Sequence, residues 1–362
     1  MPVNQWYRGA RTRHGMAGAT SSVTPAISLM KMIHKKILFS LVLTLVLSEL
    51  ALRAYSYLHP SVLAYNPSQY RKFKARPGDL SYGFPINSDG FKDQPFSTQR
   101  VSGERRVAAI GDSFVFSMVP YESSFCTVLE KRLQNVNVMN FGVIGTKPED
   151  YVTVLRNDTL RYEPDAVVLF IYVGNDFLLT RNKWYDYSAL ATVLHHTSKA
   201  LQAYNGQDIR QNYTYDDNMT PFSYADFIST ESKYAETYYL GVDRFRKEFD
   251  RTMKSVYAMR DICAEHRIRF RVVVLPDRIQ MEPDLQADVA RNLQMPVSAF
   301  DYMRPQRMLA KTLTAQHIPF VDLYSPLADA PERKFINHDI HFNIYGNRLV
   351  AELLPEDWFK ND

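Results

Sequence analysis

Five short apolar runs constrain the fold of this 362-residue chain more than any other feature. They lie at 107–110, 138–141, 166–173, 270–275 and 320–323. Because these runs are continuous rather than alternating, they are typical of strands buried on both faces of a parallel sheet. Helical patterns accompany them at 124–134, 149–160, 244–266, 304–316 and 344–354. This order predicts an α/β protein, a three-layer α/β/α sandwich around a five-stranded, mainly parallel, doubly wound sheet.

An apolar segment near the N-terminus indicates a membrane signal. It begins after Lys36, runs from 37 to 48, and reaches Leu52 if Glu49 is included. A helix over the longer stretch spans ~24 Å at ~1.5 Å per residue, which is short for a membrane span and long enough for a signal-peptide core. Glu49 and Arg53 are expected near the far membrane interface. We predict an uncleaved signal anchor at 37–57, preceding an exported domain. A cleaved signal peptide and a buried core helix are the alternatives.

The charge of the chain is concentrated before this segment. The first 36 residues contain no acid and six bases, at Arg8, Arg11, Arg13, Lys31, Lys35 and Lys36. Basic residues before an apolar segment predict a cytoplasmic N-terminus. The rest of the chain holds 37 bases and 39 acids, so the net charge of +4 does not reflect a basic stripe that would bind nucleic acid.

The composition divides the chain into four parts. Residues 1–36 are predicted to be a disordered cytoplasmic terminus and 37–57 the anchor. Residues 58–100 are polar and rich in proline, which predicts an irregular lead-in. Residues 101–360 form the α/β domain, interrupted at 178–240 by an aromatic-rich insertion. The insertion follows the third strand directly, where open α/β sheets bind ligands.

Candidate catalytic residues follow the first three strands. Ser113 comes after the first strand in the tripeptide Gly-Asp-Ser, so the strand's turn would present its Oγ and its backbone N–H at one sheet edge. Gly145 follows the second strand, and Asn175 and Asp176 follow the third. An Asn side chain and a Gly N–H can both donate to an oxyanion. Taken singly, each motif also has an ordinary interpretation as a helix cap or a turn.

A second cluster lies just before the last helical pattern. Asp339 and His341 stand there, next to His338. A His before a helix, with an Asp close by, can bring its imidazole to a Ser on another strand edge, while the Asp fixes the tautomer. A helix cap with surface histidines, and a metal site of these three residues, are the alternatives.

Together these blocks resemble the SGNH (GDSL-type) hydrolase family of the membrane-anchored bacterial type. The matching residues are 111–113, Gly145, 174–176 and the pair Asp339 and His341, and residues 87–91 are similar to the lead-in of anchored members. The resemblance implies the flavodoxin-like SGNH fold, with Ser113 as nucleophile, His341 as base and Asp339 as the third triad member. It also implies an oxyanion hole from the Ser113 N–H, the Gly145 N–H and the Asn175 side chain.

Two departures from the family pattern bear on this interpretation. Val173 stands where the third block usually has Gly. One residue separates Asp339 from His341, where the family usually has two. The second departure bears on Asp339 more than on His341, because His338 occupies the usual Asp position.

The predicted function is an exported serine esterase that removes O-acyl groups, chiefly acetyl, from a carbohydrate or related ester. An O-acetyltransferase acting on extracellular polysaccharide with the same triad, a lipid esterase or lysophospholipase, and a non-catalytic glycan-binding protein are the alternatives. Candidate substrate-binding residues are Asp112, Asp176, Trp184 and Tyr185. The sequence predicts no metal, no cofactor and no nucleic-acid partner, and leaves the oligomeric state open. The predicted location is the bacterial inner membrane, single-pass, with the catalytic domain in the periplasm.

Overall fold

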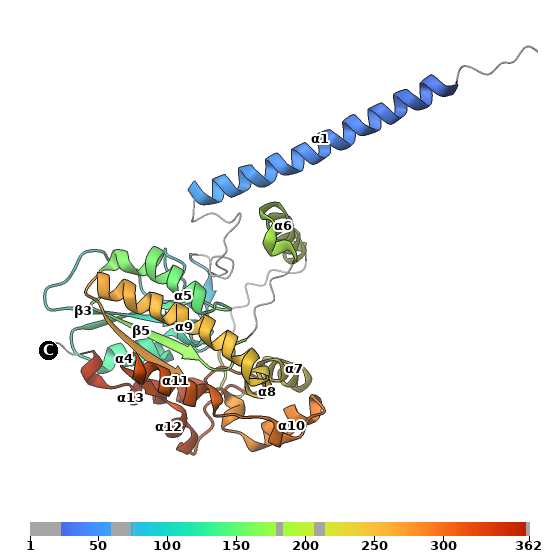
Figure 1. Ribbon diagram of the computed structural model, residues 1–362. Coiled ribbons are helices and arrows are strands. Elements are labelled where there is room, and N and C mark those ends of the chain that lie inside the picture. Colours follow the sequence, from blue (N-terminus) through green and yellow to red (C-terminus); the bar gives the residue numbers. More distant parts are fainter. Residues whose placement is uncertain (1–22, 59–73, 76, 179–183, 206–213, 360–362) are drawn as a thin grey trace, which may run out of the picture.

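The computed structural model describes residues 23–58, 74–75, 77–178, 184–205 and 214–359. An α/β body carries a sheet with helices on both faces, and one long helix projects away from that body (Figure 1). The polar lead-in contributes only the two-stranded antiparallel hairpin of β1 (Leu80–Ser81) and β2 (Phe84–Pro85).

The five predicted apolar runs form one sheet. Its strands are β3 (Arg105–Gly111), β4 (Val136–Gly142), β5 (Ala166–Tyr172), β6 (Arg269–Leu275) and β7 (Phe320–Asp322). They are ordered β4-β3-β5-β6-β7, and each neighbouring pair is parallel. The predicted doubly wound sheet is therefore confirmed, and all its strand pairs are parallel. The strand order reverses direction around β3, so the carboxyl end of β3 is the switch point where such sheets hold ligands.

The sheet is buried on both faces because successive strand residues point to opposite sides. In β5, Val168 and Phe170 pack into one hydrophobic cluster, and Leu169 and Ile171 into the other. Helices α4, α10, α12 and α13 supply the first cluster, and α5, α9 and α11 the second. The helices of the body, including the short helix α3 that follows β3, are α3 (Ser113–Phe116), α4 (Phe125–Arg132), α5 (Pro148–Val154), α9 (Val242–Glu265), α10 (Pro283–Asn292), α11 (Arg304–Ala315), α12 (Tyr324–Asp329) and α13 (Ile344–Leu353).

The projecting helix α1 (Val23–Leu58) begins earlier than the predicted anchor. Residues 23–36 were expected in the disordered terminus and are helical instead. Pro25 lies in the first turn, where its missing N–H breaks no helical hydrogen bond, and no glycine follows up to Lys36. The stretch Met30–Tyr55 is long enough to cross a membrane, and its most apolar 18 residues have a mean hydropathy of 2.0. A signal sequence near an N-terminus has the same properties, so this helix fits either an anchor or a signal.

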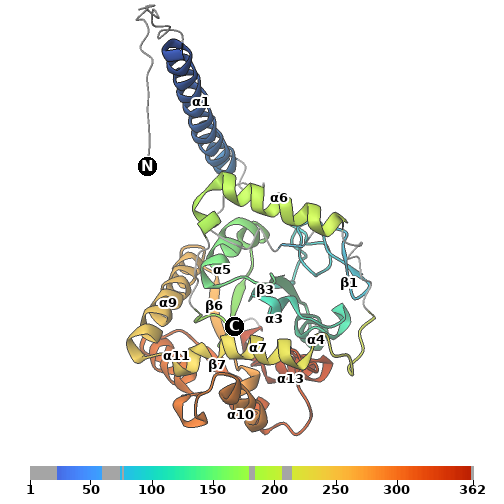
Figure 2. The same cartoon turned by 90° about the vertical axis from the view of Figure 1, so that its right-hand side faces the viewer.

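The aromatic-rich insertion contains helices that the sequence pattern did not predict. In its described parts these are α6 (Ala189–Asn205), α7 (Tyr224–Tyr234) and α8 (Glu236–Tyr239). Helix α6 lies between α1 and the body, away from α7 and α8 (Figure 1, Figure 2). The described parts of the insertion are thus divided between a helix next to α1 and two helices on the body.

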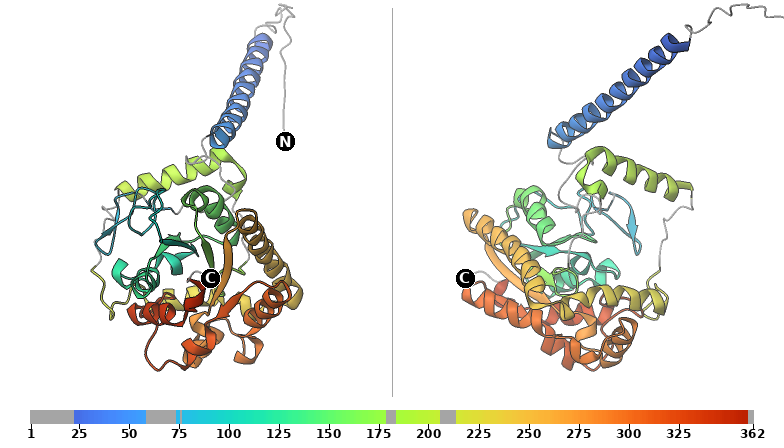
Figure 3. Two further views of the ribbon diagram at one scale, coloured as in Figure 1. Left: turned by 90° about the vertical axis from the view of Figure 1, so that its left-hand side faces the viewer. Right: turned by 45° about the vertical axis from the view of Figure 1, so that its right-hand side comes forward.

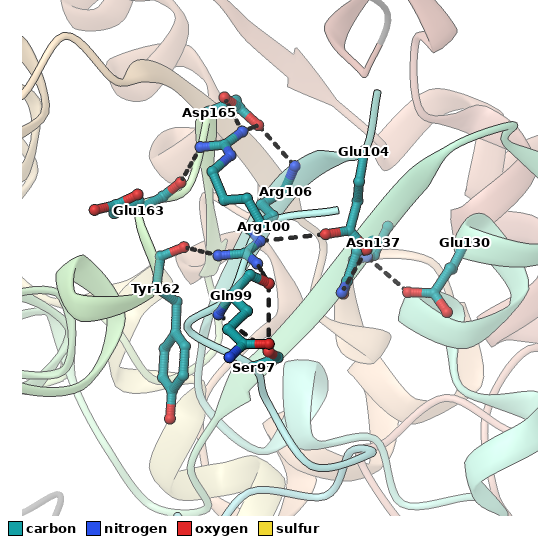
Figure 4. A network of polar contacts seen from close by, with 11 residues as sticks. Ser97, Gln99, Arg100, Glu104, Arg106, Glu130, Asn137, Tyr162, Glu163 and Asp165 are labelled. Carbon is teal, nitrogen blue, oxygen red and sulfur yellow. Dashed lines mark hydrogen bonds and ion pairs between the residues drawn. The ribbon is translucent and has the colours of Figure 1, made fainter. Parts of the chain in front are cut away.

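A polar network fixes the amino-terminal end of the sheet, opposite the candidate site (Figure 4). Arg106 on β3 is 1% exposed, and its guanidinium donates to the backbone oxygens of Tyr162 and Gln99 and to Glu104. Arg100 donates to both carboxylate oxygens of Asp165 at 2.7 Å. Asp165 also accepts from the Arg106 backbone N–H at 2.8 Å. The network joins the segment before β3 to the residues just before β5, and so fixes the amino-terminal ends of these two strands relative to each other.

Candidate active site

Ser113 is the first residue of α3, directly at the carboxyl end of β3. Asp112 caps this short helix, because its Oδ1 accepts from the Phe114 N–H at 2.9 Å. The side chain of Ser113 is 6% exposed. The sheet edge therefore holds the Ser113 hydroxyl in a defined and nearly enclosed position.

Two glycines allow this turn to pack so closely. A Cβ on Gly111 would lie 2.5 Å from Cγ2 of Val115, a branched side chain that cannot easily move. A Cβ on Gly142, at the end of β4, would lie 2.0 Å from the backbone nitrogen of Phe116. Any larger residue at either position would push α3 away from the sheet. Glycine at position 111 therefore avoids a clash in the turn that carries Ser113.

Asp339 and His341 lie on a tight loop between Phe335 and Phe342, which pair across an antiparallel bridge. The Ile336 N–H donates to the His341 carbonyl at 2.9 Å and closes the loop. Asn343 follows and caps α13 by accepting from the Gly346 N–H at 2.8 Å. The loop is therefore anchored on one side by a bridge and on the other by a helix cap.

Asp339, His341 and Ser113 form a continuous hydrogen-bonded chain. Oδ1 of Asp339 lies 2.6 Å from Nδ1 of His341, and Nε2 of His341 lies 2.8 Å from Oγ of Ser113. The same Oδ1 accepts from the His341 backbone N–H at 3.1 Å. A spacing of one intervening residue is thus sufficient, because the carboxylate binds the backbone and the ring of the same histidine.

The charge state of Asp339 follows from these contacts. Burial raises the pKa of its carboxyl, but the His341 charge and the hydrogen bonds from the His341 ring and backbone outweigh that effect. The net result is a pKa below the ordinary value. Asp339 is accordingly ionised at neutral pH and can hold the Nδ1–H of His341 while Nε2 faces Ser113.

Arg278 supports the loop from the carboxyl end of β6. Its Nη1 donates to the carbonyls of Ile336 and Asp339 at 3.0 and 2.9 Å. Its Nε donates to Glu282 at 2.9 Å, and its guanidinium lies 4.9 Å from the Phe227 ring centroid. Sequence reasoning missed this residue. Its signal was its place three residues after the end of the fourth apolar run, at the sheet edge that carries the site.

Asn175 lies at the same edge but its amide is already engaged. Its Nδ2 donates to Oδ2 of Asp112 at 2.9 Å, and its Oδ1 is buried with no hydrogen-bond partner among the described residues. Tyr234 on α7 also lies within hydrogen-bonding range of Asn175. Burial raises the pKa of Tyr234, so its phenol stays protonated. Tyr234 was not among the residues predicted from the sequence.

Asp112 and Asp176 are not placed to bind substrate directly, contrary to the sequence-based expectation. Asp112 is 2% exposed and Asp176 is fully buried. Asp176 accepts from the Tyr151 hydroxyl at 2.8 Å and from the Tyr172 N–H at 2.9 Å. Burial raises the pKa of both carboxyls. These two side chains instead build the turns that carry Ser113 and Asn175, because short acidic residues complete backbone hydrogen bonds there.

The remaining predicted residues lie in different places. Gly145 is exposed in the loop after β4 with φ +73°, a conformation that favours glycine. Tyr185 stacks on His195 of α6, with centroids 4.0 Å apart, and so belongs to the part of the insertion next to α1. The side chain of Trp184 lies outside the described residues.

The three residues considered as a metal site do not converge. His338 faces the insertion, where its Nδ1 lies 3.3 Å from the Phe222 carbonyl and its ring stacks on Phe227. His341 faces Ser113 instead. Within the described ranges, no group of three or more His, Cys, Asp or Glu side chains is arranged to hold a metal ion.

Comparisons with known proteins give only structural neighbours. No protein-family model matches the chain, and no curated protein matches it. A member of the lipolytic G-D-S-L family from Veillonella parvula is 15% identical, with 68% of this chain and 94% of that chain covered and a TM-score of 0.36. A lipase/acylhydrolase from Enterococcus faecalis is 16% identical, with 69% and 92% covered and a TM-score of 0.38.

An acetyl xylan esterase is 15% identical, with 68% of this chain and 96% of that chain covered and a TM-score of 0.37. Likenesses at these identities and TM-scores say nothing about the substrate of this chain.

Proposed function

We propose that this chain is a membrane-anchored serine esterase of the SGNH type, which removes acetyl groups from a carbohydrate outside the cytoplasm. The observation that carries the proposal is the hydrogen-bonded chain from Asp339 through His341 to Ser113, at 2.6 and 2.8 Å. Nucleophile, base and orienting carboxylate within these distances are the arrangement that activates a serine hydroxyl.

The reaction follows from the positions of these atoms. His341 Nε2 takes the proton of the Ser113 hydroxyl while Oγ forms a bond to the ester carbonyl carbon. The tetrahedral intermediate expels the sugar oxygen, which receives that proton from His341. Water then attacks the acetyl-serine, gives its proton to His341, and the return of that proton to Ser113 Oγ releases acetic acid. Asp339 stabilises the imidazolium that forms in each half.

The negative oxygen of the tetrahedral intermediate needs donors at the same edge. The Ser113 N–H at the start of α3, the Gly145 N–H and the Asn175 side chain are the proposed oxyanion hole. Asn175 joins this set when an N–H of its amide turns from Asp112 or Tyr234 toward the substrate oxygen. Such donors commonly tighten only in the complex with substrate.

A carbohydrate substrate is supported by an aromatic pair beside the catalytic loop. Tyr82 and Tyr215 pack edge to face with centroids 5.7 Å apart. The Tyr215 hydroxyl accepts a hydrogen bond from the backbone N–H of Ile344, three residues after His341. Aromatic faces near a catalytic loop can stack on the apolar faces of sugar rings. Export is supported by α1, whose stretch Met30–Tyr55 is long and apolar enough to span a membrane, and by the bases that precede it.

The test uses the full chain in detergent micelles, with acetylated and unacetylated oligosaccharides of the same length. We expect acetate release and mass loss from the acetylated sugar, and covalent labelling of Ser113 by a fluorophosphonate. Ser113→Ala should abolish both, while Ser117→Ala, a matched change of a buried serine in the same turn, should keep labelling. Labelling that persists in Ser113→Ala would contradict the nucleophile assignment. Transfer of acetyl to the unacetylated sugar without acetate release would instead identify a transferase.

A further inference from the structure

Glu49 of α1 caps a helix that lies 140 positions further along the chain. Its carboxylate accepts from the Ala189 N–H and the Leu190 N–H at 2.9 Å each, and from the Ser188 hydroxyl at 2.8 Å. These donors form the start of α6, where backbone N–H groups have no partner within the helix. Arg53 pairs with Glu49 at 2.8 Å and also donates to the Tyr187 carbonyl at 3.0 Å. The start of α6 is therefore attached to α1 by charge-assisted hydrogen bonds.

The position of Glu49 along α1 places this attachment within the apolar stretch. Glu49 lies 13 positions after Lys36, which corresponds to ~20 Å of helix, whereas the hydrocarbon core of a bilayer is ~30 Å thick. With Lys36 at the inner surface, Glu49 lies in the outer leaflet, below the headgroups. A carboxylate at that depth is costly unless it is paired. The donors from α6 and Arg53 provide that pairing, and they require the start of α6 to reach the same depth.

A groove between α1 and α6 continues the apolar surface of α1. It is an open groove of about 780 Å³ whose walls are mainly aliphatic, with Glu49, Ser188, His195 and Ser198 as its polar lining residues. Lining residues are Leu45, Val46 and Leu50 on α1 and Leu190, Ala191 and Leu194 on α6. Leu50 is 57% exposed and Leu194 is 61% exposed, which is unusual for leucines beside a cavity. The α1 wall belongs to the stretch that is apolar enough to span a membrane.

The arrangement of the two helices fits a bilayer rather than an aqueous cleft. Helix α6 runs across the end of α1, between α1 and the body (Figure 2, Figure 3). If α1 crosses a bilayer, a helix in this position lies along its surface. On α6, Leu190 and Leu194 line the groove together with Ser198, whereas the exposed Thr197 is not among the lining residues. A helix with both kinds of side chain suits the membrane interface, where one side contacts acyl chains and the other headgroups.

We propose that α6 is a membrane-surface helix, and that the groove between it and α1 is filled by acyl chains of outer-leaflet phospholipids. This inference rests on the anchoring part of the proposed function, not on the esterase chemistry. Helix α1 would then span the membrane and α6 would lie along its surface. Because the two helices lie at an angle to each other, together they restrict rotation of the body about α1. The catalytic edge of the sheet is then held in one orientation relative to the membrane.

The experiment measures membrane depth at three single positions in the full chain. A cysteine replaces Leu41 on α1, Leu194 on α6, or Val297 on the body, and carries a nitroxide label. The native Cys126 and Cys263 are buried, and Leu41 and Val297 are exposed by 57% and 43%. The chain is reconstituted in vesicles of phosphatidylethanolamine and phosphatidylglycerol. Collisions of each label with oxygen, which enters lipid, and with a water-soluble nickel chelate are compared.

We expect the label at 194 to resemble that at 41, with frequent oxygen collisions and several-fold fewer nickel collisions than at 297. Glu49→Ala should move the label at 194 toward the values at 297, and Glu49→Gln, which keeps one acceptor oxygen, should move it less. Nickel access at 194 equal to that at 297, with 41 in lipid, would overturn this inference alone. If the label at 194 is protected from both oxygen and the nickel chelate, the groove is filled by a second copy of the chain and not by lipid, and the inference is wrong. Aqueous values at 41 would overturn the anchor and this inference with it.

Discussion

The Asn175 amide nitrogen donates a 2.9 Å hydrogen bond to Oδ2 of Asp112, the residue that precedes the candidate nucleophile. The other oxygen of Asp112 caps α3 through the Phe114 N–H. One buried carboxylate thus sets the orientation of both the proposed oxyanion donor and the helix that begins with Ser113. Asp112 is a positioning residue rather than a substrate ligand.

The first prediction concerns this pair. Asn175→Ala should lower kcat by about 10²–10³-fold with little change in KM, because an oxyanion donor acts mainly in the transition state. Asp112→Asn should lower kcat less, by about tenfold, because it misorients Asn175 without deleting it. The double variant should be no worse than Asn175→Ala alone, since both changes act through the same amide. Steady-state kinetics on a soluble acetyl ester measure all three, and an unchanged kcat in Asn175→Ala would remove it from the oxyanion hole.

The second prediction concerns the two residues that orient the proton transfer. His341→Ala should lower kcat by about 10³–10⁴-fold because, in the part of the chain that the structure describes, the His341 imidazole is the base hydrogen-bonded to Ser113 Oγ. Asp339→Asn should lower kcat by a smaller factor, about 10²–10³-fold, because the imidazole of His341 remains but loses the acceptor that fixes its tautomer. Rates of fluorophosphonate labelling report both effects without a substrate. A full-rate Asp339→Asn variant would show that Ser113 and His341 work as a dyad.

The third prediction concerns Arg278, which touches no atom of the proposed reaction. Arg278→Met should lower kcat by about 10–100-fold because the loop carrying Asp339 loses both of its guanidinium hydrogen bonds. Arg278→Lys should recover only part of that loss, since an ammonium cannot serve two carbonyls and Glu282 in the same geometry.

The control for Arg278 is an ion pair within α10, the helix that follows it. Arg291→Met removes an exposed pair with Asp288 and should leave kcat unchanged. A further measurement separates a positioning role of Arg278 from a purely structural one. In the Arg278→Met background, Asp339→Asn should lower kcat by a much smaller factor than it does in the native chain. Equal costs in both backgrounds would mean that Arg278 does not act through Asp339.

The fourth prediction concerns Asp93, a buried carboxyl beneath β4. Burial raises its pKa to about 7, and the Glu130 charge adds to that effect, against hydrogen bonds from Asn140, Gln94 and Tyr121. Because the folded pKa lies above the unfolded value near 3.9, the folded chain holds a proton that the unfolded chain loses. Its stabilisation is fully present below about pH 4 and is lost as pH rises to about 7, by up to about 4 kcal/mol.

Asp93→Asn should remove most of this pH dependence, because a neutral amide can accept from Asn140 and donate to Tyr121 at every pH. Thermal unfolding of the full chain in detergent between pH 4 and 7 gives the comparison. The window stops at 7 because burial lowers the pKa of the adjacent Lys92 to about 7, which makes stability rise again above that pH. Parallel slopes for the native chain and Asp93→Asn would place the titration on another group.

The sheet and the place of Ser113 at its edge could be predicted from the sequence because both leave local signals. A run such as 166–173, without polar alternation, fits only a strand covered on both faces, and Ser113 lies directly after such a run. The fit of Asp339 to His341 could not be judged from spacing. It depends on a carboxylate that binds the backbone and ring of one residue, which is a property of loop conformation.

The features that could not be predicted from the sequence share a physical cause. Helix α6 begins with a local cap, because the Ser188 hydroxyl accepts from the Ala191 N–H at 3.1 Å, but its first two N–H groups are capped by Glu49, about 140 positions earlier in the chain. Arg278 acts on a loop about sixty positions away, and Asp176 looks like a surface residue until the fold buries it. Interactions of this kind depend on which segments the fold brings together, and composition and periodicity carry no information about that.

The distance in sequence between Ser113 and His341, 228 positions, has a consequence for biosynthesis. Ser113 leaves the ribosome within the first third of the chain, and His341 follows only just before the last α-helix, α13. Under the proposed function, Ser113 therefore has no base to take its proton until residue 341 has been made and the loop that carries it has folded. A prematurely terminated chain would carry a complete β3 and α3 and would have no activity toward esters.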